Sequence, residues 1–179
     1  AMQVAFKLGV KYREGFMKNR YIGRTFIMPG QRTRKRSVKQ KLNPIEIEFR
    51  DKRVLLVDDS IVRGHTSKNI IKMVRDCGAS KVFLASASPP IRHQNVYGID
   101  MPAAKELIGY NRSVEGIKKY IKADELIYQD LEDLTRSASI GNPKIKKFED
   151  SVFTGKYRVG NITEEFLRNL EQTRSSLPK

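Results

Sequence analysis

The sequence predicts an α/β fold with an open, mainly parallel sheet flanked by helices. Residues Val54–Val57 form a continuous apolar run, which is typical of a strand buried on both faces of a parallel sheet. Apolar residues between Ile70 and Cys77 then recur with the spacing of one buried helix face. A second apolar run at Lys81–Ala85 completes a strand–helix–strand unit, for which a right-handed crossover is expected.

The other elements are predicted in chain order from local patterns. Before the unit, a helix ends at Gly9 and a short strand lies within residues 11–23. After it come a loop over 86–100, helices over 103–108 and 113–121, a strand at Leu126–Tyr128, a helix capped by Asp130, an extended piece within 148–159 and a helix over 163–170. Ser113 is the predicted N-cap of the second of these helices.

Length and charge restrict the class of protein. A chain of 179 residues is expected to form one domain. Its net charge of +15 indicates an anionic partner: nucleic acid, an acidic membrane surface or a phosphorylated small molecule. No apolar run is long enough for a membrane span, and no signal peptide is visible. The single cysteine, Cys77, excludes an internal disulfide, is predicted to be a core residue and favours a reducing cytoplasm.

A basic segment precedes the central strand. Residues 24–44 are too polar for a core, and six of the eleven residues of Gln31–Lys41 are Lys or Arg. Composition favours a solvated, disordered run, whereas a long loop inside a domain is often functional. Its place next to the strand suggests a lid over the residues that follow that strand.

Those residues form the candidate site. Asp58 and Asp59 lie where the strand leaves the core, and a polar turn with Gly64 leads into the helix. Paired carboxylates suit a metal ion or sugar hydroxyls, and a helix N-terminus attracts phosphate. The alternatives are a solvated turn and an N-cap role for Thr66 or Ser67. Neither the Walker pattern nor the dinucleotide pattern is present, so a phosphorylated ribose fits best.

The segment VLLVDDSIVRG, Val54–Gly64, resembles the motif of type I phosphoribosyltransferases, which bind 5-phosphoribosyl 1-pyrophosphate (PRPP). Lys18–Gln31, Val96–Pro102 and Phe148–Gly155 are similar to segments of those members that are glutamine amidotransferases. The resemblance covers essentially the whole chain. It implies the first committed step of purine synthesis, in which ammonia displaces pyrophosphate from PRPP and gives 5-phosphoribosylamine.

The resemblance assigns roles to individual residues. It implies that Asp58 and Asp59 hold the ribose hydroxyls and Mg²⁺. The implied PRPP-binding residues are these two together with Ser60, Ile61, Val62, Arg63, Gly64, His65, Thr66 and Ser67, with the 5-phosphate at Arg63–Ser67. Tyr21, Arg24 and Lys41, in a lid over about 21–44, would close over the pyrophosphate and complete the catalytic set. His65 stands where the family leads us to expect threonine.

The same resemblance implies a domain organisation and partners. Residues 1–179 are expected to be a C-terminal fragment of the phosphoribosyltransferase domain, truncated at its N-terminus and extended over about 137–179. The glutaminase domain that supplies ammonia, and an earlier metal-binding position, are expected to be missing from it. Purine nucleotides are the expected feedback inhibitors, and a cytoplasmic homo-oligomer is the expected assembly.

Two other classes of function remain open at this point. One is a basic nucleic-acid-binding module, to which the run in Gln31–Lys41 would contribute. That run lacks the aromatic residues of a stacking platform, and no helix-turn-helix or zinc pattern is present. The other is a regulatory relative that binds PRPP or nucleotides without catalysing transfer. Four residues after the second strand either reach the crevice at the carboxyl ends of the strands, where the candidate site lies, or belong to an ordinary loop: Ser88, Pro89, Tyr97 and Asp100.

Overall fold

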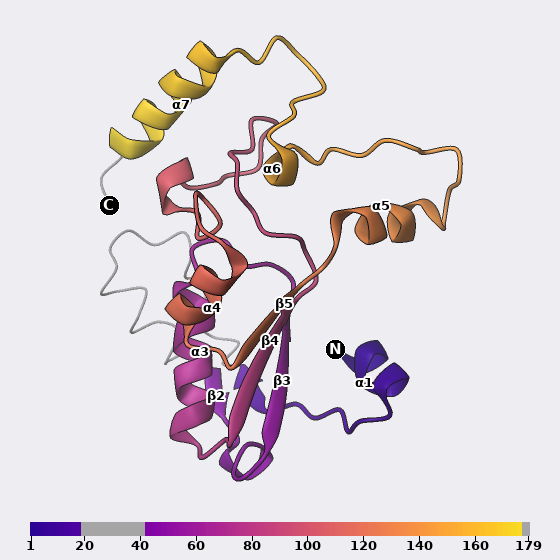
Figure 1. The fold of residues 1–179 in the computed structure, drawn as a ribbon, viewed down its shortest axis with the longest axis vertical. Helices are drawn as coiled ribbons and strands as arrows, with labels where there is room; N and C mark the ends of the chain where they lie inside the picture. Colours follow the sequence, from indigo (N-terminus) through magenta and orange to yellow (C-terminus); the bar gives the residue numbers. More distant parts are fainter. Residues whose placement is uncertain (19–41, 177–179) are drawn as a thin grey trace.

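A computed structural model describes residues 1–18 and 42–176 of the chain (Figure 1). Its central sheet consists of β3 (Arg53–Asp58), β4 (Lys81–Ser86) and β5 (Glu125–Tyr128). The strands are parallel and lie in the order β3-β4-β5. This open parallel sheet confirms the predicted fold class and all three strands predicted for it.

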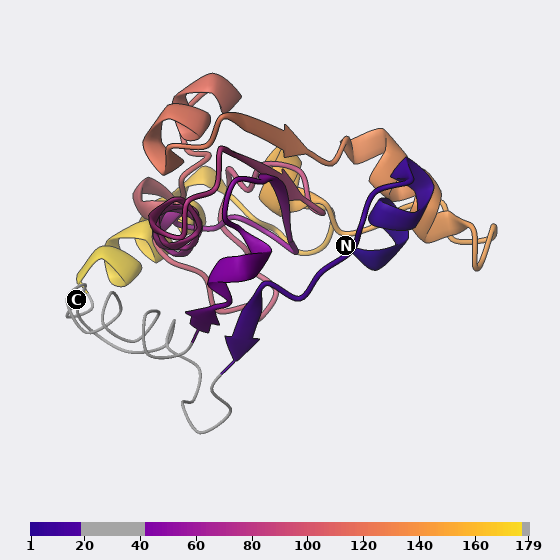
Figure 2. The ribbon, with the colours of Figure 1, turned by 90° about the horizontal axis from the view of Figure 1, so that it is seen from below.

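Helices connect these strands on one side of the sheet. Helix α3 (His65–Asp76) leads from β3 to β4, whereas η2 (Ala104–Glu106) and α4 (Val114–Ile121) lie between β4 and β5. Figure 2 shows α3 nearly end-on beside the sheet. Ser113 caps α4 by accepting from Gly116 N at 3.1 Å, as predicted, whereas the helix predicted over 103–108 is only the short η2.

The main core lies between this sheet and its helices. Val74, Val82, Ile117 and Ile121 have no exposed surface there. Each such aliphatic side chain contributes about 1.5–3 kcal/mol through burial. Cys77, predicted to be a core residue, is half-buried at the end of α3 and packs against this core.

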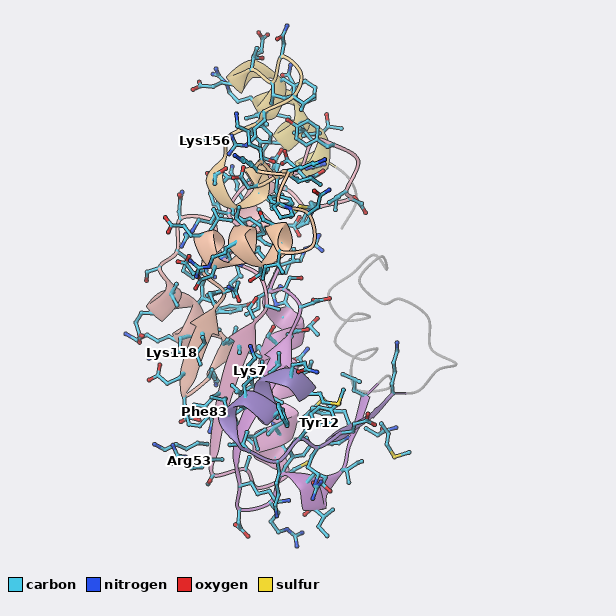
Figure 3. All side chains as sticks on the ribbon, turned by 90° about the vertical axis from the view of Figure 1, so that its right-hand side faces the viewer. Lys7, Tyr12, Arg53, Phe83, Lys118 and Lys156 are labelled. Carbon is cyan, nitrogen blue, oxygen red and sulfur yellow. The ribbon has the colours of Figure 1, made fainter. Side chains whose placement is uncertain are left out.

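The opposite face of the sheet is only partly covered. Alternate residues of β3 and β4, namely Leu55, Val57, Phe83 and Ala85, are half-buried and lie outside the core clusters. The prediction of a strand buried on both faces is therefore wrong for β3, because only one face carries the packed helices. Figure 3 shows Arg53 beside Phe83, with the guanidinium carbon 5.6 Å from the ring centre.

Helix α1 (Met2–Leu8) lies on this less covered side, away from α3 (Figure 1), whereas Phe16 packs against the main core. The helix ends at Gly9, whose φ of 63° is the left-handed cap that the sequence predicted. Strand β1 (Phe16–Lys18) pairs antiparallel with β2 (Leu42–Pro44), and η1 (Glu46–Glu48) follows. The last three residues of the predicted lid, 42–44, are therefore a strand, because β1 supplies a pairing edge. The rest of that lid lies outside the described residues.

Three helices follow the sheet. Helix α5 (Leu131–Ser139) begins at its predicted cap Asp130, whose carboxylate accepts from Glu132 N at 2.8 Å. The extended piece predicted within 148–159 is wrong, because 151–154 form the helical turn α6 (Ser151–Thr154), and α7 (Glu164–Ser176) comes last. None of the helices in residues 1–18 and 42–176 is long and apolar enough to cross a membrane.

Candidate functional site

The carboxyl ends of the three parallel strands form the edge on which the site is built. Asp58 lies opposite Ser86, and Ser86 lies opposite Tyr128. The edge is held by backbone hydrogen bonds, since Ala87 N donates to Asp58 O at 2.9 Å and Gln129 N donates to Ser86 O at 3.1 Å. This is the edge at which ligands bind in open parallel sheets.

Asp58 and Asp59 leave this edge with different environments. Asp58 is half-buried, and one carboxylate oxygen accepts from Asp59 N at 3.0 Å. Burial raises its pKa, and the neighbouring Asp59 charge raises it further, while the bond from Asp59 N acts in the opposite direction. Asp59 is exposed and accepts from the Ser60 hydroxyl at 3.1 Å. The predicted carboxylate pair therefore forms one half-buried and one solvent-facing anion.

The loop from Ser60 to Gly64, here called the connecting loop, is held in place by contacts with the main core and with Ile108. Ile61 is 1% exposed and belongs to the main core. Val62 O accepts from Ile108 N at 2.8 Å. Gly64 has a φ of 73°, and a Cβ there would lie 2.2 Å from Ile108 Cδ1. The glycine is thus required by backbone conformation and by packing.

Helix α3 begins directly after this loop. Its N-cap is Gly64, and no side chain of the described residues caps the helix, which excludes the alternative that Thr66 or Ser67 is the N-cap. The first N–H groups of any helix have no acceptor within the helix and lie at its positive end. Thr66 is exposed at this turn, whereas Ser67 is only 4% exposed. This first turn suits an anion, as the sequence predicts.

Two predicted residues have distant side-chain partners. Arg63 Nε donates to Glu106 Oε2 at 2.9 Å, so its guanidinium is in an ion pair with η2. The Nδ1 atom of His65 lies 3.0 Å from the Tyr120 hydroxyl, and the two rings meet edge to face. Glu106 and Tyr120 lie 43 and 55 residues away in sequence, and no local pattern indicated them.

Positive charge surrounds the Tyr120 ring. Lys68 Nζ lies 4.5 Å and the Arg112 guanidinium carbon 5.1 Å from its centre. Because the Tyr120 hydroxyl also contacts His65, the first residue of α3, these two cations lie near the start of that helix. The composition predicted a basic protein with an anionic partner, but it did not indicate this gathering of cations.

The remaining candidates are more scattered. Tyr21, Arg24 and Lys41 lie outside the described residues. Ser88 is at the sheet edge, where its carbonyl accepts from the Ser86 hydroxyl at 2.9 Å, whereas the Tyr97 hydroxyl donates to Val159 O at 2.8 Å. His93 is half-buried, and its ring packs closely against Gly155, where an added Cβ would lie only 2.9 Å from it.

The donor atoms at the strand end fit Mg²⁺. This ion prefers oxygen ligands and is usually held by one or two carboxylates together with substrate phosphates and water. Asp58 and Asp59 supply two carboxylates at one place. No group of three or more His, Cys, Asp or Glu side chains suited to a metal exists among residues 1–18 and 42–176. A substrate that brings its own phosphate oxygens would complete the coordination.

The raised pKa of Asp58 has a consequence for stability. The folded-state pKa exceeds the unfolded-state pKa, so the ionised carboxylate costs stability above the folded pKa and costs none below the unfolded pKa. We expect Asp58→Asn to raise the midpoint of thermal unfolding at about pH 7 and to leave it unchanged near pH 3. Asparagine keeps the oxygen that accepts from Asp59 N. A lower midpoint at neutral pH would contradict this assignment.

The sequence is similar along its whole length to part of several curated proteins. It is 58% identical over 179 residues to the amidophosphoribosyltransferase of Pseudomonas aeruginosa, covering 100% of this chain and 36% of that protein. Identity to the amidophosphoribosyltransferase of Escherichia coli is 56% over 175 residues, which cover 98% of this chain and 35% of that protein. Identity to the Saccharomyces cerevisiae amidophosphoribosyltransferase is 52% over 177 residues, which cover 99% of this chain and 34% of that protein. The chain thus spans about a third of the length of these relatives.

Solved structures give the same result. The glutamine PRPP amidotransferase from B. subtilis complexed with ADP and GMP superposes with a TM-score of 0.74 at 40% identity, covering 92% of this chain and 36% of that one. A structure described as the allosteric regulatory enzyme of purine biosynthesis also superposes with a TM-score of 0.74, at 38% identity. The superposition covers 98% of this chain and 38% of that one. No family model matches the sequence.

Proposed function

We propose that the chain belongs to the amidophosphoribosyltransferase family and carries the PRPP-binding site of such an enzyme. In the proposed reaction ammonia forms a bond to C1 of the ribose. The bond from C1 to pyrophosphate breaks, the leaving group keeps the electron pair, and the extra proton on nitrogen passes to solvent. The products are 5-phosphoribosylamine and pyrophosphate, in the first committed step of purine synthesis.

The observation that carries this proposal is the order of groups along one continuous segment. Two carboxylates end a parallel strand, the connecting loop follows, and an N-terminal helix turn without a side-chain cap completes it. PRPP has a pyrophosphate and ribose hydroxyls near one end and a 5-phosphate at the other. The carboxylates suit the hydroxyls and Mg²⁺, while the helix turn suits the 5-phosphate.

Asp58 and Asp59 are proposed to orient the ribose through its hydroxyls and to hold Mg²⁺. Bound Mg²⁺ would supply positive charge for the departing pyrophosphate. No side chain has to attack the substrate, because ammonia is the nucleophile. The protein's task is therefore to orient PRPP and to exclude water from C1.

The 5-phosphate is proposed to lie at residues 63–67. Backbone N–H groups of the first turn of α3 and the exposed Thr66 hydroxyl are the proposed donors. His65, in place of the expected threonine, offers its backbone N–H and an imidazole held by Tyr120. Ser60, Ile61 and Val62 contribute backbone rather than side-chain groups, since the loop is fixed to the core through Ile61.

Other parts of the enzyme complete the proposal. Tyr21, Arg24 and Lys41 are proposed to close over the pyrophosphate as parts of a lid. We propose that ammonia comes from a glutaminase domain, that the enzyme is a cytoplasmic homo-oligomer and that purine nucleotides compete for this site. The B. subtilis relative that binds ADP and GMP supports nucleotide regulation.

The proposal is tested by calorimetric titration of the chain with PRPP. We expect saturable binding that requires Mg²⁺, because the carboxylates alone would repel the pyrophosphate. AMP or GMP should displace PRPP, and ribose 5-phosphate should bind more weakly because it lacks the pyrophosphate. A chain that binds PRPP equally well in excess chelator, or not at all, would not carry this site.

A further inference from the structure

We infer that Glu171, on the C-terminal helix α7, is a positioning residue for the connecting loop. It acts through η2, which lies between them and contacts both. The inference rests on the proposed function, because its first readout is PRPP affinity. It assigns a role in substrate binding to a residue that lies 104 positions after the last residue of the candidate site, Ser67.

The first contact joins α7 to η2. Glu171 Oε2 accepts from the backbone N–H of Ala104, the first residue of η2, at 2.7 Å. The same oxygen accepts from the Gln94 side chain, and Arg174 donates to Asn95 O at 3.1 Å. In Figure 1 the yellow helix α7 lies beside the segment around residue 105, in agreement with these bonds. Helix α7 thus holds the loop before η2 and the start of η2 itself.

The second contact joins η2 to the connecting loop. Glu106, two residues after Ala104, accepts from Arg63 Nε at 2.9 Å. Just beyond η2, Ile108 N donates to Val62 O at 2.8 Å. Because η2 is only three residues long, its start and its end cannot move independently. A displacement at Ala104 therefore shifts both attachments of the loop that leads into α3.

The hydrogen bond that joins α7 to η2 depends on a single carboxylate oxygen of Glu171. Glu171 Oε1 and Arg174 Nη1 are buried and have no hydrogen-bond partner among the described residues. Buried polar atoms without partners cost free energy, so they lower the stability of this contact between α7 and the rest of the chain. Oε2 carries both bonds of Glu171 to the loop and to η2. Removal of this oxygen should release η2 without touching the candidate site.

The test compares three variants of the chain by calorimetry with PRPP and Mg²⁺. Glu171→Ala should weaken PRPP binding about fivefold, a size typical of coupling through packed elements. Glu171→Gln keeps an oxygen acceptor for Ala104 N and should stay within about twofold of the unsubstituted chain. Glu165→Gln removes one charge from an exposed position of the same helix and should change nothing.

A fourth variant removes the same hydrogen bond without any change in the sequence of α7. Ala104→Pro deletes the N–H that donates to Glu171 and leaves the Glu171 side chain in place. Proline is tolerated at the first position of a helix, and the preceding Ala103 already has the extended ψ of 147° that a residue before proline adopts. Ala104→Pro should weaken PRPP binding as much as Glu171→Ala does. Normal affinity in this variant would overturn the inference.

A mutant cycle separates positioning from simple destabilisation. Glu106→Ala removes the Arg63 ion pair, one of the two attachments of the connecting loop, so a further Glu171→Ala substitution should cost less PRPP affinity than it does in the unsubstituted chain. Fully additive losses would contradict a common route. Hydrogen exchange of the Ile108 amide, which is bonded to Val62, gives a readout without ligand and should speed up in Glu171→Ala. Unchanged exchange overturns the inference, whereas failure of the unsubstituted chain to bind PRPP overturns the proposed function.

Discussion

The double variant Asp58→Asn, Asp59→Asn is expected to lose Mg²⁺-dependent PRPP binding by a factor of about 100 or more. Each substitution removes a charged acceptor for ribose hydroxyls and a metal ligand, and hydrogen bonds to charged groups contribute about 1.5–3 kcal/mol each. The change is nearly isosteric, and removal of the half-buried Asp58 charge does not cost stability. Loss of binding would therefore be a local effect. Calorimetric titration with PRPP at saturating Mg²⁺ measures it.

The chain offers a matched control for this experiment. Glu132 and Asp133 are also adjacent acidic residues, at the start of α5. Their neutralisation lowers the negative charge of the chain by the same amount as the strand-end variant does. The variant Glu132→Gln, Asp133→Asn should bind PRPP like the unsubstituted chain. If both double variants bind alike, overall charge rather than the strand-end pair governs affinity. Unchanged binding in the strand-end variant alone would remove Asp58 and Asp59 from the site.

The variant Gly64→Ala is expected to lose both stability and PRPP affinity. Its Cβ would lie 2.2 Å from Ile108 Cδ1, and its φ of 73° is unfavourable for alanine. Backbone strain costs about 1–2 kcal/mol and overpacking about 1–3 kcal/mol. Because Gly64 is also the N-cap of α3, the relaxation would displace the first turn of that helix. Denaturant unfolding and PRPP titration measure the two losses.

Two further variants separate the causes. Gly9 has the same left-handed backbone conformation, with a φ of 63°, but a Cβ added there by Gly9→Ala would meet nothing within 4 Å. The excess loss in Gly64→Ala over Gly9→Ala is therefore the packing contribution. Ile108→Val removes Cδ1 and should partly restore the affinity of Gly64→Ala. If Gly9→Ala is as destabilising as Gly64→Ala, the packing argument is wrong.

The sequence predicted what depends on local pattern. Apolar runs located β3 and β4, helical spacing located α3, and the strand-end carboxylates follow from where the run at Val57 stops. The cap residues Ser113 and Asp130 were predicted because a side-chain oxygen satisfies nearby N–H groups wherever the helix packs. These features need only a few neighbouring residues.

What the sequence did not predict depends on residues far apart in the chain. The Glu106 partner of Arg63 and the Tyr120 partner of His65 come from other elements, and only the fold brings them together. The helical turn α6 has too few residues for a periodic pattern. The half-buried state of β3 depends on what covers the sheet, which no pattern within the strand reveals.

The partly covered sheet face has a consequence for how the chain behaves in solution. Ile127 is 54% exposed at its edge, and Phe6 of α1, on the same side, is 83% exposed. Apolar surface of this kind attracts copies of the chain to one another. The net charge of +15 opposes such attraction by electrostatic repulsion, which salt screens over about 10 Å at 0.1 M. The charge that would attract the proposed phosphorylated ligand therefore also opposes association of the chain with its copies, and added salt weakens both effects.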